Sequence, residues 1–298
     1  MACSPQELMA QAGCFACLSP WHRSVLKTYL LYLWSESTST PQELLRSAGC
    51  LACISPEARD AIKTMILCNF SSGTQPTPIA STLLDDLKAY YALEDVTDAV
   101  GSLDLTNSGG VTFVAGQVNN CGQFPGTEVL TYVPDAGHVI AGADATIAFW
   151  AKIANPATGP DIVCKWSAVA ADYEYTVYTD TAPARLTVRF WNAVSGSSNN
   201  YTWNLDPAID FDAWHFYLVS YTNSVPEAEV FVDNVSYGVL TITQPAGTNA
   251  GTFAIGSTPN LAWPVNGYVD EVGLWGRLLT AAERDALWNA GVGDTYPF

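Results

Sequence analysis

The amino-acid sequence predicts a mainly β protein, in which a two-sheet antiparallel sandwich follows a small all-α domain of two helix-turn-helix repeats. One pattern occurs twice before residue 71, with a period of about 36 residues, the size of one helical hairpin. After residue 82, short segments alternate between apolar and polar residues and are separated by Gly, Asn, Asp and Pro clusters. Aromatic residues make up 12% of the chain, and large rings fill the space between two sheets well.

The predicted helical domain spans residues 1–70 and consists of repeats 4–34 and 40–70. Each repeat begins with a capping box, in which Ser4 or Thr40 is the N-cap and is followed by Pro and, at the third helical position, Glu. A Gly then ends the first helix, and a Ser-Pro pair starts a second, amphipathic helix. Because one such hairpin cannot bury its apolar stripe alone, we expect the two to pack together and to anchor the chain to a larger assembly.

Each repeat carries a C-x-x-C pair in its connecting turn. Four thiolates from two such pairs can form a tetrahedral zinc site. The residues around them are apolar, unlike the polar turns of zinc ribbons, and this favours small buried thiols that pack the turn; a disulfide is the third alternative. The zinc candidates are Cys14, Cys17, Cys50 and Cys53.

Residues 71–82 read as a Ser/Thr/Pro linker. The start of the chain lacks the basic and apolar regions of a signal peptide, so reduced thiols are expected. No apolar run reaches the ~20 residues that span a bilayer, so no membrane insertion is expected.

The acidic residues are unevenly distributed along the chain. The residues before Gly73 carry equal numbers of acidic and basic side chains, so the net charge of −17 falls on the rest of the chain. That part should repel nucleic acid.

The region 83–298 contains clear strand candidates. Period-2 alternation is strongest at residues 146–151, 185–190 and 228–234. Strands of this length, repeated over roughly 200 residues between turn signals, are typical of an antiparallel sandwich.

The order of these segments resembles the laminin-G-like, concanavalin A-like jelly-roll family over nearly all of 83–298. The matching segments are residues 87–95 (an opening strand), 98–105 (a loop), 146–152 (a central strand), Trp214-His215, 230–234 (a hairpin) and the closing stretch 267–283. The closing stretch is the segment most specific to this family. It contains Thr280 and Glu283, which predict a capping box for a short C-terminal helix that turns Leu287 and Trp288 onto the sandwich. Asn234 stands where the family often has Gly, and it still permits the positive φ of a hairpin turn.

The sequence gives little support for catalysis. The E-x-D-x-x-E type motif of glycosidases with this fold does not occur. Glu227 pairs with Glu229 and Asp172 with Glu174 at strand spacing, but neither pair has a third carboxylate. Asp270 and Glu271 adjoin in a strand and are expected to point to opposite faces, and His215 is expected to be hydrogen-bonded rather than catalytic. We therefore expect no enzyme activity.

The resemblance implies a carbohydrate or protein ligand, often with calcium. No cofactor is expected to be required. The sequence does not decide whether calcium binds, because a calcium ion needs several oxygen ligands that converge on one point. Its candidate ligands are Asp95, Asp98, Asp104 and Asp270. Sugars need aromatic platforms, for which the candidates are Tyr201, Trp203 and Trp263, although their residue type favours packing against the sheet for each.

The domain order indicates a non-enzymatic virion attachment protein of a tailed bacteriophage: a head fibre, a decoration protein or a tail-associated adhesin, located on the virion. Residues 1–70 would contact other virion proteins, and residues 83–298 a surface glycan or protein; a homo-oligomer stays open. This interpretation rests on analogy of architecture. The alternatives are a bacterial surface or secreted carbohydrate-binding lectin and a divergent polysaccharide-degrading enzyme.

Overall fold

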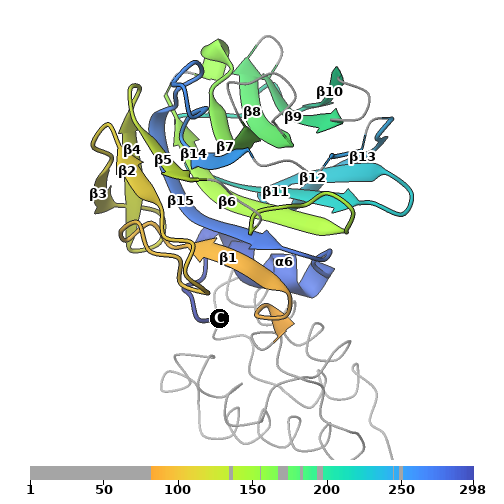
Figure 1. Ribbon diagram of the computed structural model, residues 1–298, viewed down its shortest axis with the longest axis horizontal. Helices are drawn as coiled ribbons and strands as arrows, with labels where there is room; N and C mark the ends of the chain where they lie inside the picture. Colours follow the sequence, from red (N-terminus) through yellow and green to blue (C-terminus); the bar gives the residue numbers. More distant parts are fainter. Residues whose placement is uncertain are drawn as a thin grey trace, which may run out of the picture. The chain divides into compact units, whose positions relative to one another are not determined.

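The computed structural model describes residues 82–298 except 134–136, 155, 167–173, 182–183, 193–196, 244 and 248–250. Its described part consists of two antiparallel sheets packed face to face (Figure 1). The mainly β sandwich that the sequence predicts is thereby confirmed. The helical repeats, the linker up to residue 81 and the zinc candidates Cys14, Cys17, Cys50 and Cys53 lie outside the described residues, so they stay predictions.

The eight-stranded sheet runs in the order β13, β12, β11, β6, β15, β4, β3, and β1 also pairs with β15. Its strands are β1 (Leu87–Tyr91), β3 (Thr112–Ala115), β4 (Asn120–Pro125), β6 (Ala145–Ile153), β11 (His215–Thr222), β12 (Glu227–Val232), β13 (Val235–Thr241) and β15 (Asn266–Trp275). The last strand thus lies at the centre of the sheet, so the sheet is complete only when the C-terminal part of the chain has folded.

The seven-stranded sheet runs in the order β10, β9, β8, β7, β14, β5, β2. Its strands are β2 (Thr106–Ser108), β5 (Val129–Tyr132), β7 (Asp161–Trp166), β8 (Tyr175–Thr181), β9 (Ala184–Asn192), β10 (Ser197–Asn204) and β14 (Thr252–Ile255). One α-helix, α6 (Ala281–Trp288), and two 3-10 helices, η3 (Pro156–Thr158) and η4 (Asn289–Gly291), complete the described elements.

The strands that period-2 alternation predicts at 146–151, 185–190 and 228–234 lie in β6, β9 and β12. The third is shorter than predicted, because Asp233 (φ 50°) and Asn234 (φ 63°) form the turn to β13. Both central residues have the positive φ of a two-residue hairpin turn, which confirms the conformation expected of Asn234.

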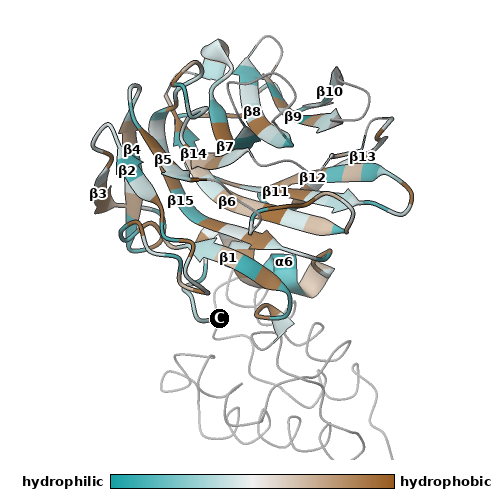
Figure 2. Ribbon diagram, in the orientation of Figure 1, coloured by the Kyte–Doolittle hydropathy of each residue, from teal (hydrophilic) through white to brown (hydrophobic). Residues whose placement is uncertain are grey.

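The main core lies between the sheets. In β9, Leu186, Val188 and Phe190 point inward and are fully buried, and the residues between them point to the opposite face. Figure 2 shows the corresponding change between hydrophobic and hydrophilic colours along β9 and β1. Burying side chains of this size contributes about 1.5–3 kcal/mol each, so the inward-facing set fixes which residues of each strand point away from the other sheet.

A second apolar cluster covers the other face of the eight-stranded sheet. Trp150, Trp275 and Leu287 belong to it, so α6 packs on the side of this sheet that faces away from the seven-stranded sheet (Figure 1). Trp288 packs against the same cluster while partly exposed. The predicted docking of the C-terminal helix is confirmed.

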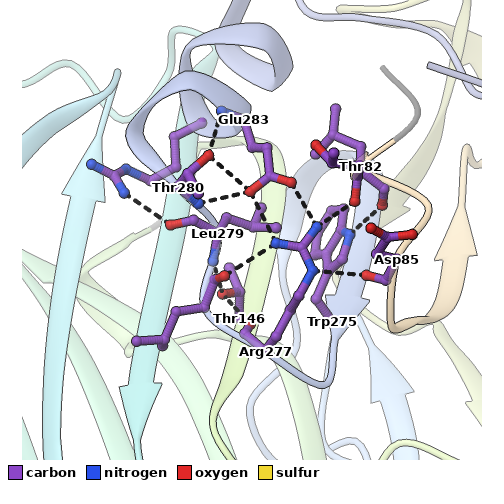
Figure 3. A network of polar contacts seen from close by, with 11 residues as sticks. Thr82, Asp85, Thr146, Trp275, Arg277, Leu279, Thr280 and Glu283 are labelled. Carbon is purple, nitrogen blue, oxygen red and sulfur yellow. Dashed lines mark hydrogen bonds and ion pairs between the residues drawn. The ribbon is translucent and has the colours of Figure 1, made fainter. Parts of the chain in front are cut away.

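Figure 3 shows the polar contacts that hold α6 in place. Thr280 and Glu283 form the predicted capping box. Arg277 makes a bidentate ion pair with Glu283, with Nη1–Oε2 and Nη2–Oε1 distances of 2.9 and 2.7 Å. Arg277 also donates to the carbonyl oxygens of Thr82 and Asp85, so the same side chain links the C-terminal helix to the start of the described chain. Burial alone would raise the pKa of Glu283, but the hydrogen bonds from Arg277 and Thr280 outweigh it and lower that pKa to about 2.

Candidate functional site

The outer face of the seven-stranded sheet, the face that points away from the other sheet, carries polar and aromatic side chains at its centre. Because Tyr175, Val177, Val188 and Phe190 belong to the inter-sheet core, strand alternation places Tyr178 of β8 and Arg189 of β9 on the outer face. The Arg189 guanidinium carbon lies 5.4 Å from the centroid of the Tyr178 ring, within cation–π distance.

Arg189 is held from two sides. Besides lying over Tyr178, it donates from Nε to Oδ1 of Asn200 in β10, at 2.7 Å. Among the described residues its two Nη groups have no hydrogen-bond partner, and no carboxylate lies within ion-pair distance of them. The guanidinium is therefore oriented by the protein while two of its nitrogens stay available to a ligand.

Asp161, the first residue of β7, supplies a carboxylate beside this arginine. A bulge follows Asp161 in the pairing of β7 with β8, and it lets Oδ1 accept from the Thr176 hydroxyl at 2.8 Å. In the part of the chain that the structure describes, Oδ2 has no hydrogen-bond partner. Burial raises the pKa of Asp161 to about 6, against the opposing effects of Thr176 and Arg189.

The loop between β14 and β15 ends next to Asp161. Its Trp263 carbonyl oxygen accepts from the Asp161 amide at 3.0 Å, and the Trp263 side chain is 51% exposed. The preceding turn is held by Thr258, whose carbonyl and hydroxyl oxygens accept from the amides of Leu261 and Ala262. Leu261 adopts φ 58°, a conformation uncommon for a bulky residue. The fold thus fixes the backbone of an exposed tryptophan beside Asp161, the first residue of β7.

The aromatic platforms predicted from the sequence divide into two groups. The prediction is wrong for Tyr201 and Trp203, since both rings belong to the inter-sheet core, with exposures of only 8% and 3%. Trp203 donates from Nε1 to the Gly238 carbonyl oxygen at 2.8 Å, which links β10 to β13 at one edge of the sandwich. Period-2 alternation could not decide this, because the loop before β10 gave no indication of which face each ring takes. Trp263 is exposed, and its role stays a prediction.

The four calcium candidates do not gather around one point. Asp98 is buried and accepts hydrogen bonds from four backbone amides, those of Tyr90, Val100, Gly101 and Leu103. Asp95 and Asp104 each accept from an amide of the same loop, whereas Asp270 lies in β15 and accepts from the Val118 amide. Within the described ranges, no group of three or more acidic, His or Cys side chains is arranged to hold a metal ion.

The expectation that Asp270 and Glu271 point to opposite faces is wrong. Val269 and Val272 both belong to the inter-sheet core although they are three residues apart, and Glu271 has φ 49°. A β-bulge at this point therefore places both carboxyl groups on the face away from the seven-stranded sheet. Both are buried, and among the residues that the structure describes Oδ1 of Asp270 and Oε2 of Glu271 have no hydrogen-bond partner.

The residues considered for catalysis have other partners. Glu174 is fully buried, with Oε2 3.3 Å from Nζ of Lys165 and Oε1 accepting from the amides of Ile140 and Ala141. Glu227 is the first residue of β12, which lies in the eight-stranded sheet. His215 contacts Asp233 through Nδ1 at 2.7 Å and the Asp210 carbonyl through Nε2 at 3.0 Å, so it is hydrogen-bonded as expected.

Comparison with known proteins assigns the family. A laminin-G-type family profile, described as the concanavalin A-like lectin/glucanases superfamily, matches residues 126–283, more than half of the chain. The chain belongs to this superfamily. The resemblance found in the sequence is thereby confirmed. No curated protein matches the chain in sequence.

Solved structures with this superfamily fold include several binding domains. The binding domain of Paraclostridial Mosquitocidal Protein 1 has a TM-score of 0.56 and 15% identity, covering 70% of this chain and 53% of its own. The binding domain of Botulinum Neurotoxin DC in complex with SialylT has a TM-score of 0.53 and 11% identity, with coverages of 70% and 51%. This chain thus spans about half the length of those toxin domains.

Domain 4 of AbnA, an extracellular arabinanase from Geobacillus stearothermophilus, was solved in complex with arabinotriose. Its TM-score is 0.52 at 16% identity, and the match covers 70% of this chain and 98% of that domain. At such identities these similarities show the fold, and the chemistry of the site has to come from the residues of this chain.

Sequence reasoning missed Tyr178, Arg189 and Asp161. One signal was present: Arg185 and Arg189 lie four apart in a predicted strand, so they share a face, in a region where acidic residues greatly outnumber basic ones. Tyr178 and Asp161 gave no such signal, because they join Arg189 only through the pairing of β7, β8 and β9.

Proposed function

We propose that residues 83–298 form a non-catalytic carbohydrate-binding domain, and that the glycan lies on the outer face of the seven-stranded sheet. The observation that carries this proposal is the juxtaposition of a fixed donor, Arg189, with a buried acceptor, Asp161. A sugar presents hydroxyl groups that both donate and accept, so a rigid donor and acceptor side by side suit it. Trp263, whose backbone is hydrogen-bonded to Asp161, adds an exposed aromatic ring against which the apolar face of a sugar can pack.

The comparisons support the same class of function. The solved structures with this fold include one in complex with arabinotriose and one in complex with SialylT. A divergent polysaccharide-degrading enzyme is the less favoured alternative, because Glu174 forms a buried ion pair with Lys165 and directly precedes β8 of the seven-stranded sheet, whereas Glu227 begins β12 of the eight-stranded sheet. Release of reducing sugar from a polysaccharide, abolished by Glu174→Gln, would favour the enzyme.

The test is binding of the full chain to a glycan array, followed by titration calorimetry on the glycans that bind. Trp263→Ala is expected to weaken binding by about tenfold, which corresponds to about 1.4 kcal/mol. Tyr268→Ala removes a partly exposed aromatic ring from the eight-stranded sheet and is the matched control, with no change expected. Absence of binding to any glycan, or equal losses in both variants, would refute the proposed site.

We also propose that residues 1–70 attach this domain to a bacteriophage virion, where it acts as a head fibre, decoration protein or tail-associated adhesin. The support is the duplicated helical pattern in the sequence. Genes for capsid, portal or tail proteins next to the gene of this chain, and labelling of purified particles by an antibody against the chain, are the expected results. A signal peptide encoded upstream would favour the bacterial lectin instead. In the described part of the chain, no helix has the length and apolar character needed to cross a membrane.

A further inference from the structure

The region from Gly73 onward is strongly acidic, and most of its few basic side chains have identifiable partners. It contains 24 acidic and 7 basic residues, which accounts for the net charge of −17. Lys165 is paired with Glu174, Arg185 with Asp180, and Arg277 with Glu283. Arg284 donates to the Leu279 carbonyl oxygen and lies over the Phe231 ring. Neither Arg189 nor Arg284 has an ion-pair partner among the described residues, but Arg284 uses a terminal nitrogen within the protein, whereas Arg189 uses only Nε, so both of its Nη groups stay available.

The surroundings of Arg189 fix its orientation before any ligand arrives. Asn200 accepts from Nε, and the Tyr178 ring supports the plane of the guanidinium. Tyr178 itself packs beside Gly159, where an added Cβ would lie 3.8 Å from the ring. A guanidinium held in this way loses little conformational entropy on binding, and its two Nη groups form the fork that matches the two oxygens of a carboxylate.

From this geometry we infer that the glycan bound at the outer face carries a carboxylate, which pairs with the Nη groups of Arg189. The inference rests on the proposed function and names the ligand class for the same site. Sialic and uronic acids share this chemistry. A single carboxylate per site suits the charge of the domain, because one available guanidinium can compensate one negative charge. A polyanion would place many charges against an acidic surface and be repelled.

The experiment titrates the full chain with two ligands that carry one carboxylate each, 3′-sialyllactose and an aldobiouronic acid (one glucuronate linked to a neutral sugar), and with the methyl ester of each. We expect at least one acid to bind about tenfold or more tightly than its ester, since charge-assisted bidentate pairs are roughly twice as strong as neutral hydrogen bonds. The acid that shows this difference identifies the source of the carboxylate.

Arg189→Gln is expected to abolish the difference between acid and ester, and Arg189→Lys to keep only part of it, because lysine retains the charge but lacks the fork. Arg185→Gln is the matched control on the same strand and face, and it should leave the difference intact because Arg185 is already paired with Asp180. Equal affinity for acid and ester, or a difference that survives in Arg189→Gln, overturns the inference. Binding of neutral glycans alone overturns it while the proposed function stands, and absence of all glycan binding overturns both.

Discussion

The two carboxyl groups at the β15 bulge should make the stability of this domain fall as the pH rises. Burial raises the pKa of Asp270 to about 7 and that of Glu271 to about 8, and the proximity of Asp270 adds to the second shift. A carboxyl group whose pKa is higher in the folded state binds more protons there than in the unfolded chain. Its stability contribution is therefore complete at about pH 4 and is lost as the pH rises toward 8.

The magnitude follows from these shifts. One pKa unit corresponds to 1.36 kcal/mol, so between pH 5 and pH 8 the loss is at most about 3 kcal/mol for Asp270 and about 4 kcal/mol for Glu271. Asp270→Asn/Glu271→Gln removes both titrations and keeps the shape of the side chains. The free energy of unfolding of this variant, relative to the unsubstituted protein, should therefore rise by several kcal/mol over that interval.

The assay is urea unfolding followed by tryptophan fluorescence at pH 5, 6, 7 and 8, with EDTA present. Asp285→Asn, an exposed carboxylate on α6, is the control and should run parallel to the unsubstituted protein. If the double variant also runs parallel within about 1 kcal/mol, the reasoning is refuted. Repeating the series with calcium tests whether calcium binds here, since a bound cation would favour the ionised carboxylates and reverse the slope.

The remaining predictions concern the buried Lys165–Glu174 pair, the Arg277–Glu283 pair at the start of α6, and the proposed binding face. Lys165→Met should lower the free energy of unfolding by about 3–5 kcal/mol in urea titrations at pH 7, because Glu174 stays buried without its partner; a loss below about 1 kcal/mol would contradict this. Glu283→Gln should cost about 3 kcal/mol above pH 4.5 and progressively less as the pH falls toward 2, where the native carboxylate is itself protonated; a cost independent of pH in that range would contradict it. Affinity for a carboxylated glycan, measured by calorimetry, should increase as the pH falls from 7.5 to 5, because burial raises the pKa of Asp161, beside Arg189, to about 6, so its negative charge is lost over this range; Asp161→Asn should remove the increase.

The sequence by itself determined the features that depend on local rules. Alternation placed β6, β9 and β12, and the spacing of Thr280 and Glu283 predicted the capping box, because each depends on residues within a few positions of one another. The family resemblance also came from the sequence, through the closing stretch 267–283. These local rules do not predict which residues pair with one another across neighbouring strands.

Only the tertiary structure decided which side chains meet. A single extra residue in β15 reversed the expected orientation of Glu271, because a bulge shifts the period-2 pattern by one position and leaves no mark in composition. Tyr201 and Trp203 became core residues because β13 covers the edge to which they belong. The proposed binding face arises in the same way: Asp161, Tyr178, Arg189 and Asn200 come from four strands, and they converge because hydrogen-bonded strands lie only about 5 Å apart, however far apart their residues are in the chain.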